Sequence, residues 1–416
     1  MLPPALVLGP PKFIAPLGVM RSLGRMGVSV HGLVHRGRSV AVASRYCAGT
    51  VSVGVNGRPI GDPQTLVGQL LDAGRILGRG TVLIPASDEW AALVARNATE
   101  LRPTFTFAHN SPELVEALAS KQSLATLAYE HRLPTPITFA PSSPEDAAAL
   151  APDLTYPVIV KPLESRPGMT MKALADDSAA MLTWFERMVE SPDNPNVSIQ
   201  QYIPGGDHDS WLFNGYLDAD SRCLAAFTGT KLRQHPRRLG IASLVVTRHN
   251  AELIDQTVRF LAEIGYRGAV DIDYRYDARD GLYKVVDFNP RLGGAFRAFV
   301  DDSGMDVARA LYLDLTGREV AVGRAVDGRR WMKEDADLIA LRYYHKHEGL
   351  TIRGWLRSLR GVREGGTFAR DDPMPFLVAM LQLFTRTTGH KLRRRGRVIG
   401  RAVRPALRRF TAREGA

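Results

Sequence analysis

Residues 268–294 read GAVDIDYRYDARDGLYKVVDFNPRLGG. Apolar and polar residues alternate in the runs DIDY and VVDFN, and the turn-forming segment ARDG separates them. This pattern predicts a β-hairpin centred on Asp280. Because side chains alternate between the faces of a strand, two cross-strand pairs should share one face of this hairpin. The two pairs are Asp273 with Asp287 and Asp271 with Asn289.

Three carboxylates and an amide on one face repel one another unless a cation lies between them, and such hard oxygen ligands suit Mg²⁺. The alternative is a polar, solvated hairpin face, since a turn longer or shorter by one residue would split the set between the two faces. The following residues favour the metal site. Pro290 ends the strand ladder, and Arg291 then projects beside the acids, where a guanidinium suits anionic oxygens in phosphoryl transfer.

A second feature lies upstream, where the apolar run YPVIVKP of residues 156–162 ends in Lys161. A lysine at the end of a buried strand points into a cleft and pairs with phosphate oxygens. The alternative is a snorkelling lysine at a sheet edge. Neither a GxxxxGK[ST] loop nor a GxGxxG motif in the right context is present.

The rest of the chain reads as two kinds of structure. Residues 1–110 alternate strand and helix patterns, which predicts an open, mostly parallel α/β unit. A helix is expected from Ser111 to about His131, followed mainly by strands up to Arg248. One amphipathic helix interrupts them, with Asn250 as its N-cap and Gly265 just past its end.

The composition limits the classes of protein to which the chain can belong. The chain has 416 residues, of which 45% are hydrophobic and 23% charged, as in ordinary globular proteins. No run of 18 apolar residues and no signal-peptide pattern occurs, so a cytoplasmic protein is expected. The two cysteines, Cys47 and Cys223, lie too far apart in the sequence for a disulfide framework or a Cys-based zinc site.

The net charge of +11 belongs largely to the C-terminal tail. Residues 391–410, KLRRRGRVIGRAVRPALRRF, hold nine basic residues and no acid. The tail either contacts an anionic membrane surface or an acidic partner, or is a frayed, solvated end. Nucleic-acid binding is not expected, because only Phe410 supplies an aromatic ring within the basic run.

Taken in order, six short motifs resemble the ATP-grasp superfamily of carboxylate–amine ligases. The resemblance extends over about residues 1–317 and rests on the order and spacing of the motifs. They are Ser120-Lys121, Leu133-Pro134-Thr135-Pro136, Val158 to Pro162, Gln200 to Gly205, Asp273, and Asp287 to Arg291.

The resemblance implies an α/β unit followed by a two-part ATP-grasp fold with antiparallel sheets and a helical, basic C-terminal region. The expected divisions are an N-terminal unit at 1–110, the ATP-grasp unit at 111–320, a C-terminal extension at 321–390 and a basic tail at 391–416.

Site residues follow from the same resemblance, position by position. Lys121 and Lys161 match the two ATP-phosphate lysines, and Asp207 falls where an acid holds the ribose hydroxyls. The match assigns adenine contacts to Gln200, Gln201, Tyr202 and Ile203, Mg²⁺ ligands to Asp273, Asp287 and Asn289, and catalytic or triphosphate contacts to Arg291, Lys231 and Arg233.

This sequence departs from the family pattern at three places. Asp287 stands where the family commonly has Glu, and Gln200 and Gln201 stand where the hinge often has Glu. The loop expected to cover the phosphates, residues 164–172, is poor in glycine.

The implied reaction is ATP-dependent amide formation. A substrate carboxylate takes the γ-phosphate, and an amine attacks the acylphosphate, with ATP and Mg²⁺ required and Mn²⁺ as an alternative metal. The substrates implied are small amino-acid or peptide-like carboxylates and amino-acid amines, as in D-aspartate-type ligases; a carbamoyl-phosphate-synthase-like or cofactor-modifying activity stays open. The competing function is a non-catalytic nucleotide-binding module whose basic tail contacts a membrane or a partner. The sequence does not indicate an oligomeric state.

Overall fold

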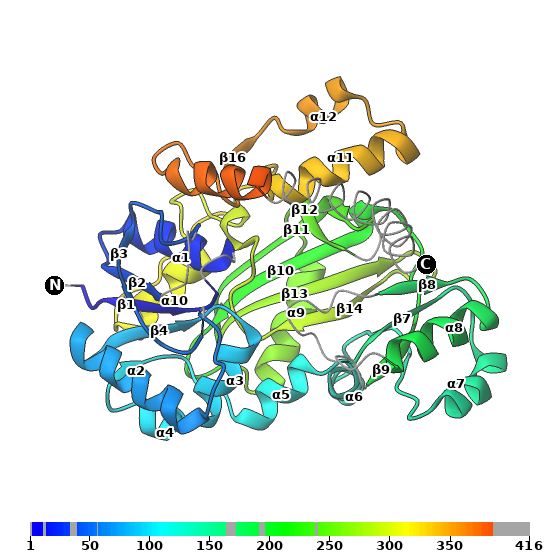
Figure 1. The fold of residues 1–416 in the computed structure, drawn as a ribbon, viewed down its shortest axis with the longest axis horizontal. Coiled ribbons are helices and arrows are strands. Elements are labelled where there is room, and N and C mark those ends of the chain that lie inside the picture. The colour runs from blue at the N-terminus through cyan, green and yellow to red at the C-terminus, as the bar shows by residue number, and fades with distance from the viewer. Residues whose placement is uncertain are drawn as a thin grey trace, which may run out of the picture.

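In a computed structural model, the chain is described over residues 2–10, 14–33, 40–55, 57–163, 172–190, 196–237 and 240–385. The basic tail at 391–416 and nearly all of the loop at 164–172 lie outside these ranges. Three sheets organise the described chain (Figure 1). Among the described residues, no helix is long and apolar enough to cross a membrane.

The N-terminal part is a parallel sheet in the order β3-β2-β1-β4-β5, as the sequence predicted. Its central strands are buried on both faces, which explains their continuous apolar runs. The strands are β1 (Ala5–Leu8), β2 (Val30–Leu33), β3 (Cys47–Val51), β4 (Thr81–Pro85) and β5 (Phe105–Thr106). The helices are α1 (Ile14–Gly24), α2 (Pro63–Leu77), α3 (Asp88–Arg96) and α4 (Ala98–Leu101).

Two more sheets follow. Antiparallel sheets were expected here, and all their strand pairs are antiparallel except one parallel pair at the edge of the larger sheet. The smaller sheet has the order β6-β9-β7-β8, and two helices cover it. Its strands are β6 (Thr138–Phe139), β7 (Val158–Pro162), β8 (Ala173–Ala175) and β9 (Val197–Gln201), and its helices are α7 (Pro144–Leu150) and α8 (Ser178–Val189), with a 3₁₀ turn at Ala151–Asp153.

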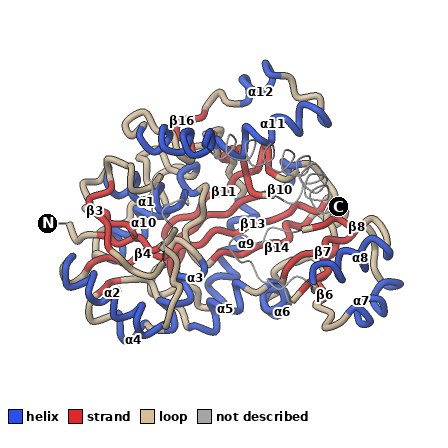
Figure 2. Tube along the Cα trace, in the orientation of Figure 1, coloured by secondary structure: helices blue, strands red, loops and turns tan. Residues whose placement is uncertain are grey.

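The larger sheet has seven strands in the order β14-β13-β10-β11-β12-β15-β16. It runs across the middle of the molecule, as the red strands of Figure 2 show. Its strands are β10 (Ser210–Leu217), β11 (Cys223–His235), β12 (Ile241–Thr247), β13 (Gly268–Asp277), β14 (Leu282–Asn289), β15 (Arg330–Met332) and β16 (Val362–Gly365). Short 3₁₀ turns occur at Asp207–Asp209 and Phe296–Ala298.

The remaining helices pack on this sheet or extend from it. The helix predicted from Asn250 to Gly265 is confirmed: the Asn250 side chain accepts from the Leu253 amide at 3.0 Å, and Gly265 follows in the left-handed region. The C-terminal extension was expected to be helical, but it also adds two strands to the large sheet. The helices are α9 (Ala251–Glu263), α10 (Val307–Leu315), α11 (Glu334–Glu348), α12 (Ile352–Ser358) and a helix at 374–385.

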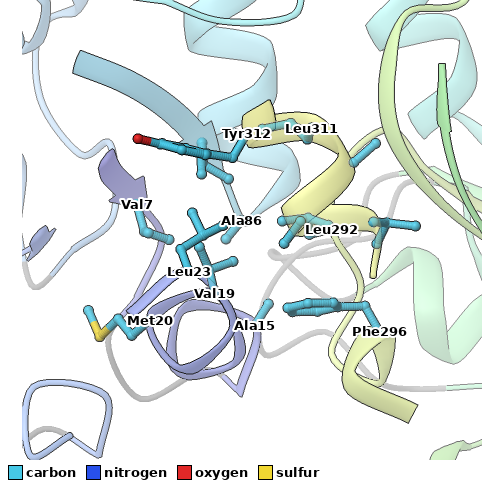
Figure 3. Close-up of a cluster of buried hydrophobic side chains, with 14 of the residues drawn as sticks. Val7, Ala15, Val19, Met20, Leu23, Ala86, Leu292, Phe296, Leu311 and Tyr312 are labelled. Carbon is cyan, nitrogen blue, oxygen red and sulfur yellow. The ribbon is translucent and has the colours of Figure 1, made fainter. Parts of the chain in front are cut away.

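One hydrophobic core joins the first residues of the chain to its second half (Figure 3). Ala15, Val19 and Leu23 of α1 face Leu292, Phe296 and the buried side of α10. The approach is close, because a Cβ at Gly18 would lie 2.7 Å from the Phe296 ring. The expected division near residue 110 therefore does not separate two hydrophobic cores, and the boundaries themselves stay predictions.

Charged side chains fix the same junction beneath the C-terminal extension. The guanidinium of Arg21, 1% exposed, donates to the equally buried Asp372 at 2.9 Å, across 351 residues of sequence. Arg25 pairs with Glu364 and Asp371, both at 2.8 Å. A buried ion pair offsets its loss of hydration only when each charge has hydrogen-bond partners. These pairs join α1 to residues 364–372, so the C-terminal extension packs as part of the same fold.

Candidate active site

A cleft lies where the small sheet meets the large one. Side chains from both sheets and from the connection between them line it, which is how two separate arrays come to enclose one site. Its lining includes Ile159, Lys161, Lys172, Gln200, Gln201, Tyr202, Ile203, Ser210, Lys231, Gln234, Asp273, Arg275, Val286 and Asp287.

Three of the predicted site lysines are buried at this cleft, each less than 7% exposed. The Lys161 ammonium on β7 donates to Gln200 Oε1 at 2.8 Å. On the large sheet, Lys231 Nζ donates to Asp273 Oδ2 at 2.6 Å. Lys121 pairs with Asp287. The structure therefore brings Lys121, Lys161 and Lys231 together with both strand carboxylates, as the resemblance implied.

The position of Lys121 corrects one prediction. The helix expected from Ser111 to about His131 is broken at Ser120, whose backbone is extended, into α5 (Pro112–Ala119) and α6 (Lys121–Glu130). Ser120 caps α6 by accepting from the Ser123 amide, and the Lys121 amide donates to the Leu163 carbonyl at 3.1 Å. Leu163 directly follows β7, so this break places Lys121 beside the end of the strand that carries Lys161.

Burial makes these lysines strong attractors for an anion. It lowers the pKa of Lys161 well below its usual range, and the positive charges of Lys121 and Lys172 lower it further. Burial also lowers the pKa of Lys121 to about 8, with Lys172 adding to the effect and the carboxylates of Asp88 and Asp273 opposing it. Burial and mutual repulsion therefore oppose the charged forms of Lys121 and Lys161, and a bound polyanion would favour them.

The predicted pairing of the hairpin is confirmed: Asp273 lies opposite Asp287, and Asp271 lies opposite Asn289. Near the turn, however, the register differs by one, since Tyr274 pairs with Val285. A β-bulge at Val286 takes up the difference and returns Asp287 to the face of Asp273. Without the bulge, the two carboxylates would lie on opposite faces of the sheet.

The acids fit a metal that is partly held by its substrate. Asp273 and Asp287 are both partly exposed at the cleft, with side chains 23% and 28% accessible. Over the described ranges, no cluster of three or more His, Cys, Asp or Glu residues could hold a metal alone. Mg²⁺ commonly binds through one or two carboxylates, with phosphates and water completing its shell. The pair suits that arrangement, with Asn289 as an expected third ligand.

Asp271 shares the hairpin face with the other two acids, but amide groups hold its carboxylate. It accepts from Asn214 Nδ2 at 3.0 Å and from the Asn289 amide at 3.3 Å. Burial raises its pKa to about 6, and repulsion from Asp273 adds to this. The segment after β14 covers it so closely that a Cβ at Gly293 would lie 2.2 Å from its carboxyl carbon. It is therefore held within the hairpin by amide donors and is not among the residues that line the cleft.

Arg291 connects the hairpin to the N-terminal sheet. Its Nε donates to Asp88 at 3.0 Å and its Nη2 donates to Asn289 Oδ1 at 2.8 Å. Asp88 is the first residue of α3, which Ser87 caps. The sequence did not point to Asp88, because nothing local relates it to a strand 200 residues later. The contact places the N-terminal part at the edge of the site.

The predicted adenine segment lines the cleft from Gln200 to Ile203. It is held by Arg275, a residue that the sequence analysis missed. Arg275 Nη1 donates to the Gly206 carbonyl at 2.7 Å, and its Nε donates to the Ile203 carbonyl at 3.3 Å. Arg275 follows Asp273 by two positions on the same strand face, and that spacing was the available signal.

Two other cleft residues were missed. Lys172 precedes β8, where Ala173 pairs with Val160, so continuing this register by one residue places Lys172 opposite Lys161. Gln234 lines the cleft and donates to Asp207 Oδ1 at 2.7 Å. The other oxygen of Asp207 accepts from Tyr344. Asp207 is therefore already engaged by protein partners, and its contact with a ribose stays a prediction.

The structure places Arg233 away from the cleft, unlike the prediction. The resemblance assigned it a triphosphate or catalytic contact together with Lys231, but a β-bulge between the two residues turns Arg233 to the other face of the strand. Its Nε and Nη2 both donate to Asp337 of α11 at 2.9 Å, and its Nη1 donates to Ser358. Arg233 thus fixes the C-terminal extension to the back of β11 and does not enter the cleft.

We expect Arg233→Met to weaken the fold and leave nucleotide binding unchanged. Asp337 is fully buried, and losing its charged partner should cost about 3–5 kcal/mol of unfolding free energy. Urea unfolding and ATP titration by calorimetry measure the two effects. The double variant Arg233→Met/Asp337→Leu should recover stability, because it removes the orphaned carboxylate. A large loss of ATP affinity in either folded variant would return Arg233 to the site.

No family model matches the chain. It is 29% identical over 240 residues to D-aspartate ligase of Enterococcus faecium, a match that covers 55% of this chain and 57% of that protein. The chain thus matches little more than half the length of this relative.

Solved structures resemble it in fold at low sequence identity. Biotin carboxylase from Campylobacter jejuni aligns with a TM-score of 0.60 at 13% identity, covering 79% of this chain and 74% of that one. L-amino acid ligase from Bacillus licheniformis aligns with a TM-score of 0.57 at 14% identity, covering 77% of each chain. With its two antiparallel sheets closing on one cleft behind a parallel α/β unit, the chain has the ATP-grasp fold that its motifs implied.

Proposed function

We propose that this protein is an ATP-dependent carboxylate–amine ligase. One observation carries the proposal: buried lysines from both antiparallel arrays converge on a cleft that also holds the facing carboxylates of Asp273 and Asp287. A polyanion accompanied by a divalent cation satisfies both sets at once, because it replaces the present lysine–aspartate pairs with lysine–phosphate and aspartate–metal contacts. A triphosphate with Mg²⁺ is such a ligand.

The residues of the cleft divide the work between them. Gln200 to Ile203 form the strand and connection beside which the adenine would lie, and Arg275 holds that connection in place. Lys161, Lys121 and Lys231 neutralise the phosphate oxygens. Asp273, Asp287 and Asn289 would hold Mg²⁺, which when bound neutralises and orients the transferring phosphate.

In the proposed reaction, the substrate carboxylate takes the γ-phosphoryl group and ADP leaves. The amine then attacks the carbonyl carbon of the acylphosphate, and phosphate leaves as the C–N bond forms. Catalysis of this kind needs alignment and charge neutralisation and no nucleophilic side chain. Arg291 lies at the end of β14 beside Asn289, where its guanidinium is placed to meet developing negative charge once it exchanges Asp88 for the substrate.

The proposed substrates are a small amino-acid or peptide-like carboxylate and an amino-acid amine. Similarity to D-aspartate ligase supports this class, and the contact of Arg291 with Asp88 places the N-terminal part beside the reacting end of the cleft. The expected contact of residues 391–410 with a membrane or an acidic partner falls outside the described residues and stays a prediction, as does the cytoplasmic location.

The test is release of ADP and phosphate from Mg-ATP by the purified chain, measured across pairs of amino acids and small carboxylates. We expect release to require one acid and one amine together, with a stoichiometric amide product by mass spectrometry. Asp287→Ala should abolish it, whereas Asp280→Ala, at an exposed turn position of the same hairpin, should not. Tight ATP binding without release under every pair would favour a nucleotide-binding module.

The pKa of Lys121 predicts the pH dependence of ATP binding. Phosphate prefers the protonated ammonium, so ATP affinity should fall as pH rises above about 8, by up to about tenfold per unit. Lys121→Arg should keep its affinity at pH 9. Because the folded pKa lies below the unfolded 10.5, the unliganded protein should instead gain stability between about pH 8 and 10.5, relative to Lys121→Met. Titration calorimetry and thermal unfolding at each pH test the opposite trends.

A further inference from the structure

Large hydrophobic side chains gather on the surface of the C-terminal extension. Of the eighteen that are exposed over the described ranges, ten lie between residues 338 and 384. This concentration is unusual for a monomeric globular surface, where exposed apolar residues are normally scattered singly. The extension therefore presents a surface whose partner the cleft chemistry does not explain.

The first part of this surface is α12. Its inner side is fastened to the protein, since Trp355 Nε1 donates to Asp337 at 2.8 Å and the Ser358 carbonyl accepts from Arg330 at 2.6 Å. Its outer side carries Ile352 and Leu356, one helical turn apart and 65% and 56% exposed.

Arginines surround these two apolar residues. The segment 349–363, GLTIRGWLRSLRGVR, contains four arginines and no acid, and Arg353, Arg357 and Arg360 are exposed. A helix of this composition combines an apolar face with positive charge, which is the pattern of helices that lie in the interface of an anionic bilayer.

The helix at 374–385 presents a second exposed apolar face, without charged residues of its own. Val378 and Ala379 pack against the shared core, while Met374, Leu377 and Leu381 are 52%, 55% and 45% exposed at helical spacing. Both helices lie along one edge of the molecule, opposite α4 and α5 (Figure 1). The two helices can therefore both contact one external surface.

The sequence continues this charge pattern beyond the described chain. From 373 to 413 it contains no acidic residue, and the nine basic residues of the tail fall immediately after the second helix. Reversible attachment to a membrane needs two signals, apolar insertion and a polybasic segment; the extension supplies the first, and its arginines and the basic tail supply the second. An acidic protein partner would use the charges but would not require two separated aliphatic stripes.

We propose that α12 and the helix at 374–385 form a docking surface for an anionic lipid bilayer. The helices lie flat on it, with Ile352, Leu356, Leu377 and Leu381 inserted among the lipids and the arginines at the headgroups. The proposal is independent of the ligase activity.

The test is sedimentation of the full chain with vesicles of phosphatidylcholine alone and with one-third phosphatidylglycerol. We expect binding only to the anionic vesicles, weakened by salt. Ile352→Ser/Leu356→Ser and Leu377→Ser/Leu381→Ser should each reduce it about tenfold or more. Ile76→Ser is the control, because Ile76 is 80% exposed on α2, outside the extension. All of these positions are exposed, so unfolding temperatures should not change.

Three results would overturn the proposal. The first is no binding to anionic vesicles at low salt. The second is binding that truncation after His390 abolishes while both serine pairs bind like the wild type, which would assign the contact to the tail alone. The third is a dimer, detected by light scattering, that the serine pairs dissociate, which would make a second copy of this chain the occupant of the surface.

Discussion

Replacing Lys161 with methionine is expected to reduce kcat/KM for ATP by about 100- to 1,000-fold, or roughly 3–4 kcal/mol. Methionine keeps the length of the side chain and removes the ammonium. Lys161 is 4% exposed and its ammonium donates to the neutral Gln200 Oε1 at 2.8 Å, an acceptor that a phosphate oxygen can replace. A buried ammonium that donates to a neutral acceptor gains more from an arriving phosphate than from that acceptor.

Stability should change little in the same variant. Removing the buried ammonium relieves its desolvation, while Gln200 loses its donor, and these opposing effects should leave the unfolding free energy within about 1 kcal/mol of the wild type. Fluorimetric unfolding with and without Mg-ATP measures both properties. Lys333→Met is the control, since Lys333 pairs with Asp335 outside the cleft. A stable Lys161→Met variant that still binds ATP with wild-type affinity would contradict the assignment of the cleft.

The second large effect is expected from the facing carboxylates. Asp287→Asn and Asp273→Asn each preserve the shape of the side chain and remove one charge, and each should lower kcat about 1,000-fold, or roughly 4 kcal/mol. Each loss should be accompanied by a higher Mg²⁺ requirement, because one ligand of the metal becomes neutral. Turnover followed against Mg²⁺ and then Mn²⁺ measures this.

In these variants the affinity for metal-free ATP and the rate of turnover should change in different directions. Each substitution leaves a lysine without its partner, Lys121 in one case and Lys231 in the other, so affinity for metal-free ATP should hold or increase. Asp280→Asn is the matched control on the same hairpin. Loss of metal-free ATP binding in step with turnover would mean that the aspartates serve only to fix the lysines.

The predicted pairing of Asp273 with Asp287 is right, although the predicted turn register is not. The alternation of DIDY and VVDFN fixes which residues of each strand share a face, and a turn centred on Asp280 aligned the two sets. The actual turn is offset by one residue, and the bulge at Val286 restores the alignment. Arg233 shows the opposite outcome, because there a bulge turned away from the cleft a residue that the resemblance had assigned to the site. Bulges depend on the neighbouring strand, so a single sequence does not reveal them.

Contacts between distant elements were equally hidden. Ser111-Pro112-Glu113 correctly marked a helix start, but the break at Ser120 that aims Lys121 at the cleft depends on a carbonyl after β7. Asp88 and Lys172 carry no local sign of their role. Periodicity and caps therefore predicted the elements, and the order of motifs predicted the fold. The partners of each charged side chain required the tertiary structure.

The pairing of Arg21 with Asp372 also has a consequence for how the chain acquires its structure. Synthesis runs from the N-terminus, so α1 leaves the ribosome about 350 residues before the carboxylate that neutralises it. The apolar side of the same helix must likewise wait for Phe296 and α10. Contacts of such long sequence separation carry a large loop-closure cost and slow folding. The side of the N-terminal sheet that α1 covers should therefore remain open and protease-sensitive on a nascent chain until the final hundred residues have been made.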